Sequence, residues 1–307
     1  MKNVQTHLFT GFLGTGKTTA LRHLLTQKPQ EEKWAIIVNE FGDIGIDGAV
    51  LSNNEVPVAE IAGGCLCCVA GPQMTVTVNN ILKKYRPHRL LIEASGLAHA
   101  ASVIDELQAP YLIEALSIGA NVTLVDPRQF VHPDYAKQAL YRDQISIADI
   151  LIANKVDLCD IETLSTFRRT ANQLFPPKSL IKEVTQGKIE LSWLLDTQTT
   201  TKSRYRLKGL AQSEIAFQSE GFIFDPKLGF HGERLTQFFD ELPTLCEGLV
   251  RAKGIFKVLG TWVWLNWAEG YWGANQVAWR KDSRFELIAK KFDAELIANR
   301  LQECVEE

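Results

Sequence analysis

Three of the six cysteines in this 307-residue chain lie within four positions of one another, in the stretch GGCLCC. The spacing of Cys65, Cys67 and Cys68 does not suit structural disulfides, whereas thiolates are good ligands for Zn²⁺ and Cu⁺. Three thiolates fill three corners of a tetrahedron, but a structural zinc site takes four protein ligands, and no second Cys or His pair is present here. The cluster therefore predicts a metal site that can release its ion. A redox pair and three small buried residues are the alternatives.

A phosphate-binding loop is predicted at GFLGTGKT, residues 11–18, which follows an apolar run and opens a helical stretch. The pattern G-x-x-x-x-G-K-[ST] directs backbone N–H groups toward the phosphates of a nucleotide. We expect Lys17 to reach the β- and γ-phosphates and the Thr18 hydroxyl to bind Mg²⁺. The other expected nucleotide contacts here are Gly11, Gly14, Thr15, Gly16 and Thr19. A glycine-rich turn that fits the pattern by chance is the alternative.

The motif NKVD, residues 154–157, indicates which base the nucleotide carries, and it also follows a short apolar run. The Asp157 carboxylate can accept hydrogen bonds from N1–H and the exocyclic amine of guanine, and adenine offers neither donor in that arrangement. Together with the phosphate loop, Asn154, Lys155 and Asp157 favour a guanine nucleotide. A helix-capping Asn beside a surface ion pair is the alternative. VTQG, residues 184–187, is a weaker candidate for a loop that closes over the base.

Two stretches between these motifs are placed to sense the γ-phosphate. NEFGDIGID, residues 39–47, follows the second predicted strand, and its acidic residues have a solvated turn as their alternative interpretation. IEASG, residues 92–96, ends the third predicted strand. We expect Glu93 to face Mg²⁺ and the attacking water, and the backbone N–H of Gly96 to contact the γ-phosphate.

These motifs must be positioned by a regular framework, and the first two thirds of the chain alternates short apolar runs with amphipathic stretches. The predicted strands are Thr6–Thr10, Ala35–Val38, Leu90–Ile92, Val122–Val125 and Ile150–Ala153. The clearest predicted helices between them are Thr18–Leu25 and Gln73–Tyr85. Near-continuous apolar strands separated by helices are typical of an α/β fold, in which helices cover both faces of a mostly parallel sheet.

A polar stretch at Thr197–Ser203 reads as a linker, so we expect a nucleotide domain at residues 1–200 and a smaller α+β domain at residues 204–307. The strand-like runs of the second domain are Ile215–Phe224, Gly254–Leu259, Thr261–Trp267 and Phe285–Ala289. Helices are predicted around Leu235–Leu242 and from about Asp293 to Cys304. Trp262 and Trp264 share one face of a strand. This aromatic face either packs in the core of the domain or forms a surface that binds a client protein.

The composition excludes several classes of function. A net charge of −3 gives no general electrostatic reason to bind nucleic acid or an anionic membrane. No apolar run approaches the roughly 20 residues that span a bilayer, and the first residues show no secretory signal. The other cysteines, Cys159, Cys246 and Cys304, are scattered singly, which is typical of a reduced cytosolic chain. We therefore expect a cytoplasmic protein.

The ordered set of motifs resembles the CobW family of P-loop GTPases, G-protein-like metallochaperones with a C-x-C-C motif. The resemblance rests on GFLGTGKTT, NEFG, GGCLCC, EASGLA and NKVD, and RAKGIF at residues 251–256 is similar to a strand of the family's C-terminal domain. It implies GTP hydrolysis coupled to delivery of a metal, most often zinc, to a client metalloprotein. It also implies that Cys65, Cys67 and Cys68 are the zinc ligands and that Glu93 stands in the Walker B position.

The chain departs from the family pattern in three places. Many relatives have a His-rich tract, whereas the six histidines here are dispersed, which puts metal storage in doubt. Ala100 stands where many relatives have Pro. Val38 stands where some have Glu, which leaves Glu40 and Asp43 as candidate acidic metal ligands.

Three other functions stay open on these residues. A GTPase that assists cobalt or corrinoid metabolism shares every motif, so Co²⁺ or another metal is an alternative to zinc. A non-catalytic zinc storage or sensing module needs more ligands than three thiols. A P-loop kinase for a small molecule prefers adenine, which NKVD disfavours. The sequence decides neither the client, nor the fourth metal ligand, nor the oligomeric state, for which a homodimer stays open.

Overall fold

The computed structural model describes residues 3–38, 56–60, 70–96, 100–195, 204–205, 218–268, 270–277 and 282–306. The chain divides into two compact units, Met1–Thr199 and Thr200–Glu307. None of the described helices is both long and apolar enough to cross a membrane.

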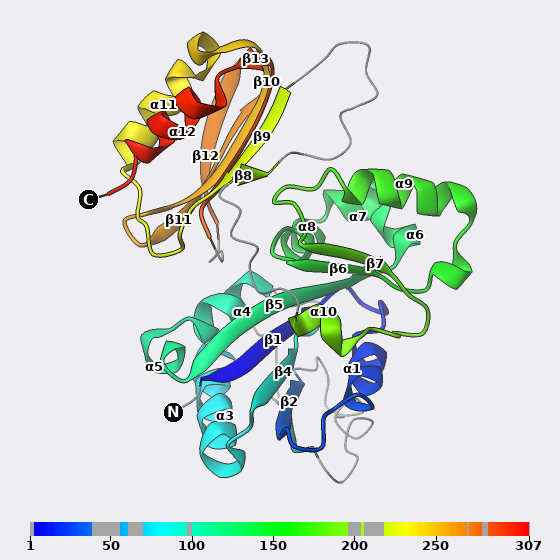
Figure 1. Cartoon of the computed structure of the whole chain (residues 1–307). Coiled ribbons are helices and arrows are strands. Elements are labelled where there is room, and N and C mark those ends of the chain that lie inside the picture. Colours follow the sequence, from blue (N-terminus) through cyan, green and yellow to red (C-terminus); the bar gives the residue numbers. More distant parts are fainter. Residues whose placement is uncertain are drawn as a thin grey trace. The chain divides into compact units, whose positions relative to one another are not determined.

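The first unit is built on a seven-stranded sheet in the order β3-β2-β4-β1-β5-β6-β7 (Figure 1). Every neighbouring pair of strands in it is parallel. The strands are β1 (Val4–Thr10), β2 (Trp34–Val38), β3 (Val58–Glu60), β4 (Arg89–Glu93), β5 (Leu116–Val125), β6 (Ile150–Ala153) and β7 (Leu180–Glu183). β2, β4 and β6 are buried along their whole length, which explains why β2, β6 and the centre of β4 are continuous apolar runs instead of alternating ones.

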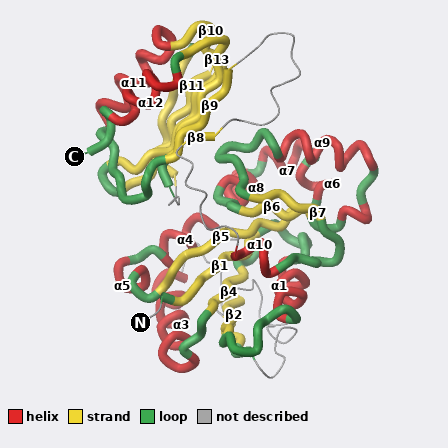
Figure 2. Tube along the Cα trace, in the orientation of Figure 1, coloured by secondary structure: helices red, strands yellow, loops and turns green. Residues whose placement is uncertain are grey.

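Helices cover both faces of this sheet, as Figure 2 shows. They are α1 (Lys17–Leu25), α3 (Ala70–Tyr85), α4 (Ala100–Leu107), α5 (Pro110–Ile113), α6 (Pro127–Phe130), α7 (Pro133–Lys137), α8 (Ala139–Ser146), α9 (Ile161–Ala171) and α10 (Leu191–Leu195). One core cluster packs α1 and α10 against strand residues on one face of the sheet. A second cluster packs α6, α8 and α9 against strand residues whose side chains point to the opposite face. The predicted α/β class with a parallel sheet is confirmed.

The second unit is a six-stranded antiparallel sheet in the order β12-β11-β10-β13-β9-β8. Its strands are β8 (Arg204–Tyr205), β9 (Gln218–Ile223), β10 (Cys246–Val258), β11 (Thr261–Ala268), β12 (Tyr271–Val277) and β13 (Arg284–Phe292). Two helices, α11 (Gly232–Leu245) and α12 (Ala294–Gln302), accompany the sheet. The predicted smaller α+β fold is therefore confirmed.

Alternation along β11 separates its tryptophans. Trp267 and Leu265 point into the core that α11 and α12 share with the sheet. Trp262 and Trp264 lie on the other face because neighbouring residues of a strand point to opposite sides. Trp262 is nevertheless buried and Trp264 is half-buried, so neither is a freely exposed aromatic surface.

Candidate nucleotide-binding site

The predicted nucleotide motifs all lie at the carboxyl-terminal ends of strands in the parallel sheet, which together form one edge of it, the carboxyl edge. β1 leads into the phosphate loop, β4 ends at Glu93, and β6 leads into Asn154. Because all these strands point the same way, their carboxyl ends lie side by side, which is where open α/β sheets bind ligands.

The phosphate loop ends in the first turn of α1. Gly16 is the residue before the helix and has φ 93°, in the left-handed region that favours glycine. A Cβ atom at Gly16 would lie 2.5 Å from Nδ2 of Asn154, so the close approach of the NKVD turn also requires glycine here. Gly16 has no side chain to cap α1, and the first N–H groups of a helix favour an anion at this end.

Lys17 lies over the loop that precedes it. Its Nζ donates to the carbonyl oxygens of Gly11, at 2.9 Å, and Phe12, at 3.2 Å, and the residue is only 8% exposed. The ammonium is thus held at the N-terminus of α1, where negative phosphate oxygens are favoured by both the charge and the helix dipole.

Thr18 and Glu93 bring two oxygen ligands together. The Thr18 hydroxyl donates to Oε1 of Glu93 at 2.8 Å, and Glu93 is 4% exposed at the end of β4. A hydroxyl and a carboxylate beside a phosphate loop form the hard oxygen set that Mg²⁺ prefers. The described residues therefore fit the magnesium ion that the motif predicts.

Gly96 lies against the phosphate loop. A Cβ atom at this position would be 2.8 Å from the backbone nitrogen of Leu13, so a larger residue would push the two segments apart. The Gly96 carbonyl accepts a hydrogen bond at 3.1 Å from Nε2 of Gln144, a buried residue of α8. Gln144 is a positioning contact that the sequence motifs did not indicate.

Asn154 connects three segments of the site. Its Nδ2 donates to the Thr15 carbonyl at 2.9 Å, and its Oδ1 accepts from the Gly187 N–H at 3.0 Å. Gly187 has φ 66° and lies so close to α1 that a Cβ would be 2.7 Å from the Ala20 nitrogen. Asn154 is therefore an internal brace between the phosphate loop and the VTQG loop, and the alternative of a helix-capping Asn is wrong.

Asn154→Ala should destabilise the first unit strongly, because it leaves the Thr15 carbonyl and the Gly187 N–H buried without this partner. Each unsatisfied group costs about 1–3 kcal/mol. Asn154→Asp is a second variant, which keeps an acceptor for Gly187 but replaces the donor to Thr15 with a buried, charged oxygen. Urea unfolding should give both variants a lower midpoint than the wild type. Equal midpoints for all three would contradict the bracing role.

The NKVD turn places its two charged residues differently. Lys155 has φ 64° and ψ 33°, the left-handed conformation, and begins the short 3-10 helix η1 (Val156–Leu158). Asp157 lies in this turn with its side chain exposed, as a group that reads a base must be. The Lys155 Nζ lies 3.9 Å from Oδ2 of Asp126, a buried residue directly after β5 that the sequence motifs did not single out.

The predicted metal-site residues Cys65, Cys67, Cys68, Glu40 and Asp43 lie outside the described residues, as does the predicted linker 197–203. Within the described ranges, no group of three or more His, Cys, Asp or Glu side chains is placed to hold a metal ion. The remaining cysteines, Cys159, Cys246 and Cys304, are free thiols. Burial raises the pKa of Cys246 and Cys304 to about 11, so both stay protonated at neutral pH.

Residues 5–182 match the family described as "CobW/HypB/UreG, nucleotide-binding domain", which is more than half of the chain. The chain belongs to this family. Residues 219–305 match a second family description, "Cobalamin synthesis protein cobW C-terminal domain". Both matches agree with the resemblance that the motifs carry.

Two curated relatives are similar to part of the chain. The chain is 42% identical to the zinc chaperone YeiR of Escherichia coli over 186 residues, which are 61% of this chain and 56% of that protein. It is 32% identical to the zinc chaperone CobW of Pseudomonas aeruginosa, over 61% of this chain and 58% of the relative. The chain thus spans less than two thirds of the length of these relatives.

The fold has a solved counterpart. The crystal structure of Zn(II)-bound YjiA GTPase from E. coli is similar with a TM-score of 0.52 and 18% identity, over 99% of both chains. At this identity the likeness concerns the fold alone, and it covers both units.

Proposed function

We propose that this chain is a GTP-hydrolysing metallochaperone that binds zinc through its C-x-C-C cluster and transfers the ion to a client metalloprotein. The observation that carries the proposal is the convergence of the phosphate loop, Glu93 and the NKVD turn at one edge of the parallel sheet. The thiol cluster, in the chain segment between β3 and α3, supplies the soft ligands that a zinc cargo requires. The names of the relatives YeiR and CobW, both zinc chaperones, support the same cargo.

In the proposed reaction, each residue of the edge has a distinct task. Lys17 stabilises the charge that develops on the transferred phosphate, and Glu93 orients the attacking water. Gly96, held by Gln144, presents its backbone N–H to the γ-phosphate. Mg²⁺, held by Thr18 and Glu93, would neutralise charge on the phosphate oxygens. Within the described ranges, no arginine lies at a position recognised for an arginine finger, the side chain that stabilises transition-state charge in some GTPases. We therefore expect GTP hydrolysis to be slow until metal or a client is bound.

We assign the nucleotide and metal functions to residues 1–200 and leave residues 204–307 as the second domain. A second candidate, assistance to cobalt or corrinoid metabolism, has one observation in its favour, the cobalamin-related description of the family that matches residues 219–305. Competitive titration of the purified chain with Zn²⁺ and Co²⁺ separates the two. Zinc selectivity supports the first function, and cobalt selectivity supports the second.

The proposal is tested first at the base. Asp157→Asn should weaken GTP binding by roughly 10- to 100-fold, the value of one or two hydrogen bonds to a charged group. It should also raise the affinity for xanthosine triphosphate, because the new amide can donate to the 2-oxo group. Nucleotide affinities measured with a fluorescent analogue give both numbers.

Asp160→Asn is the matched control for this experiment. Asp160 lies three residues on and caps α9 through the Thr163 N–H at 2.7 Å, a bond that Asn can also accept. We expect unchanged GTP affinity in this variant. A wild-type chain that binds ATP as tightly as GTP would overturn the guanine assignment.

A further inference from the structure

Asp126 is a buried carboxylate beside the candidate nucleotide site. It follows β5 directly, is 2% exposed, and accepts from the Arg128 backbone N–H at 3.1 Å as the N-cap residue of α6. A buried charge is costly unless it is paired and hydrogen-bonded, so its partners indicate what it does.

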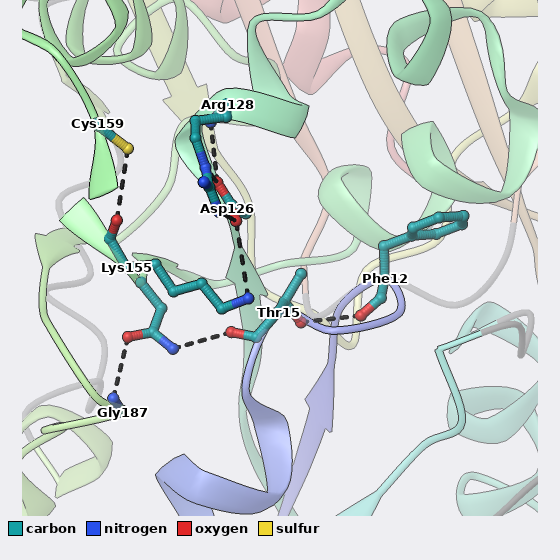
Figure 3. A network of polar contacts seen from close by, with 8 residues as sticks. Phe12, Thr15, Asp126, Arg128, Lys155, Cys159 and Gly187 are labelled. Atoms are coloured by element: carbon teal, nitrogen blue, oxygen red, sulfur yellow. Dashed lines mark hydrogen bonds and ion pairs between the residues drawn. The ribbon is translucent and has the colours of Figure 1, made fainter. Parts of the chain in front are cut away.

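Two cations share this carboxylate (Figure 3). Arg128 binds it with two parallel hydrogen bonds, Nε to Oδ1 at 2.9 Å and Nη2 to Oδ2 at 2.6 Å. Lys155 brings its Nζ to within 3.9 Å of Oδ2. Burial acts to raise the pKa of Asp126, but the hydrogen bonds from Arg128 and the charges of Arg128 and Lys155 outweigh it and hold the pKa below its usual range. The carboxylate is therefore ionised at neutral pH.

The backbone of Lys155 is in a conformation that must be held by its surroundings. A non-glycine residue at φ 64° is strained, and such positions persist where neighbouring contacts fix them. The Lys155 carbonyl accepts from the Leu158 N–H at 3.0 Å and from the Cys159 thiol at 3.5 Å. On its other side, Asn154 is fixed to the phosphate loop. These backbone contacts thus fix the position of the Lys155 Cα atom, independently of where its side chain extends.

From this origin the side chain extends from the end of β6 toward Asp126 at the end of β5, and these two strands are paired neighbours. A lysine stem between two strand ends presents a strip of methylene groups at the carboxyl edge of the sheet. A flat purine needs an apolar contact of this kind, and a long flexible side chain offers it only when its ammonium group is anchored.

We propose that Asp126 is a positioning residue for guanine-nucleotide binding, which anchors the ammonium of Lys155 so that its stem forms one wall of the base site. This inference rests on the proposed function, because it needs a guanine nucleotide at this edge. The competing explanation is purely structural: Asp126 caps the four-residue helix α6 and fixes Arg128.

A double-mutant cycle separates the two explanations. The affinity for GDP is measured for the wild type, Asp126→Asn, Lys155→Met and the double variant. The Asn variant keeps the shape and one acceptor for Arg128, but it loses the charge and the second acceptor oxygen, Oδ2, which Arg128 and Lys155 share. We expect it to weaken GDP about tenfold when Lys155 is present, and less than about twofold when residue 155 is Met, a coupling typical of residues in contact.

Equal weakening in both backgrounds would show that Asp126 acts through α6 and would overturn the inference, as would no weakening in either. Glu241→Gln is the control, since it alters a carboxylate–arginine pair, that of Glu241 and Arg300, in the second unit, and it should leave GDP affinity unchanged. If Asp126→Asn does not fold in a urea titration, Asp126→Glu, which displaces the charge by one methylene, passes through the same cycle with the same expected dependence on Lys155. A wild type that binds no guanine nucleotide fails at the first measurement, and that result counts against the proposed function itself.

Discussion

Lys17→Ala should abolish measurable GTP hydrolysis. The ammonium group lies at the N-terminus of α1, held by the Gly11 and Phe12 carbonyls, where the β- and γ-phosphates are expected. Its positive charge is already in place before charge develops on the phosphate, and removing one such preorganised group from a reaction site costs about 10²–10³ in kcat. Steady-state release of inorganic phosphate from GTP in the presence of Mg²⁺ measures the loss.

The chain offers a matched control for this substitution. Lys28 also donates to two backbone carbonyls, those of Pro29 at 3.3 Å and Glu32 at 3.1 Å, but it follows the C-terminal end of α1. Lys28→Ala should therefore leave the hydrolysis rate unchanged. Glu93→Gln should keep nucleotide binding and lower the rate, because it preserves the shape beside Thr18 and removes the charge. Unchanged rates in both Lys17→Ala and Glu93→Gln would show that the phosphate site is wrongly assigned.

The sequence predicted the centre of the parallel sheet well and its edges poorly. β6 begins and ends where the apolar run Ile150–Ala153 does, because a strand buried on both faces leaves a continuous apolar signature. β7 at the sheet's edge reads LIKE, and its charged residues lie where one side of the strand is open. β12 is likewise an exposed edge strand whose Gly and Asn residues have low strand propensity. Such strands exist because a neighbour pairs with them, which a local pattern does not show.

The start of β10 was also not predicted from local hydrophobicity. The apolar run Gly254–Leu259 predicted only its second half, whereas the strand begins at Cys246. Its first half pairs with β13, and between the buried Cys246 and Ala252 its residues are exposed or half-buried and include the charged Glu247 and Arg251. Pairing over a long range, and not local hydrophobicity, determines where this strand starts.

The candidate site likewise has residues that could be predicted from the sequence and residues that could not. Motif residues such as Asn154 could be named from the sequence because they stand in short motifs of recognisable spacing. Their supporting partners could not, since Gln144 and Gly96 are 48 residues apart and no local pattern joins them. Asp126 precedes a proline and looks like an ordinary helix-capping residue, which it also is. Its second contact, with Lys155, exists only because β5 and β6 are neighbours in the sheet.

Zinc affinity should depend on the bound nucleotide. The cysteine segment follows β3, and β2 pairs with both β3 and β4, so that Val38 is the register partner of Glu60 on one side and Glu93 on the other. The chain therefore enters the segments beginning at residues 39, 61 and 94 from adjacent strand ends. We expect the γ-phosphate to contact the first and third segments, and contacts on both sides to alter the zinc affinity of the second. A coupling free energy of about 1–3 kcal/mol, which is typical between two linked sites, corresponds to roughly 5- to 150-fold in affinity.

The measurement is competition for Zn²⁺ between the chain and a chelator, in the presence of a non-hydrolysable GTP analogue, of GDP, and of no nucleotide. Cys67→Ser should weaken zinc binding and remove the dependence on nucleotide while GTP binding stays nearly intact, because a hydroxyl is a poor ligand for this metal. Cys304→Ser is the control: its thiol lies in the second unit and donates to the Arg300 carbonyl, as a hydroxyl also can. Linkage requires reciprocity, so zinc must change GTP affinity by the same factor by which GTP changes zinc affinity. Equal zinc affinities in all three states would leave a GTPase that binds metal without a switch, since a nucleotide that does not discriminate between zinc-bound and zinc-free forms cannot drive the release of the ion.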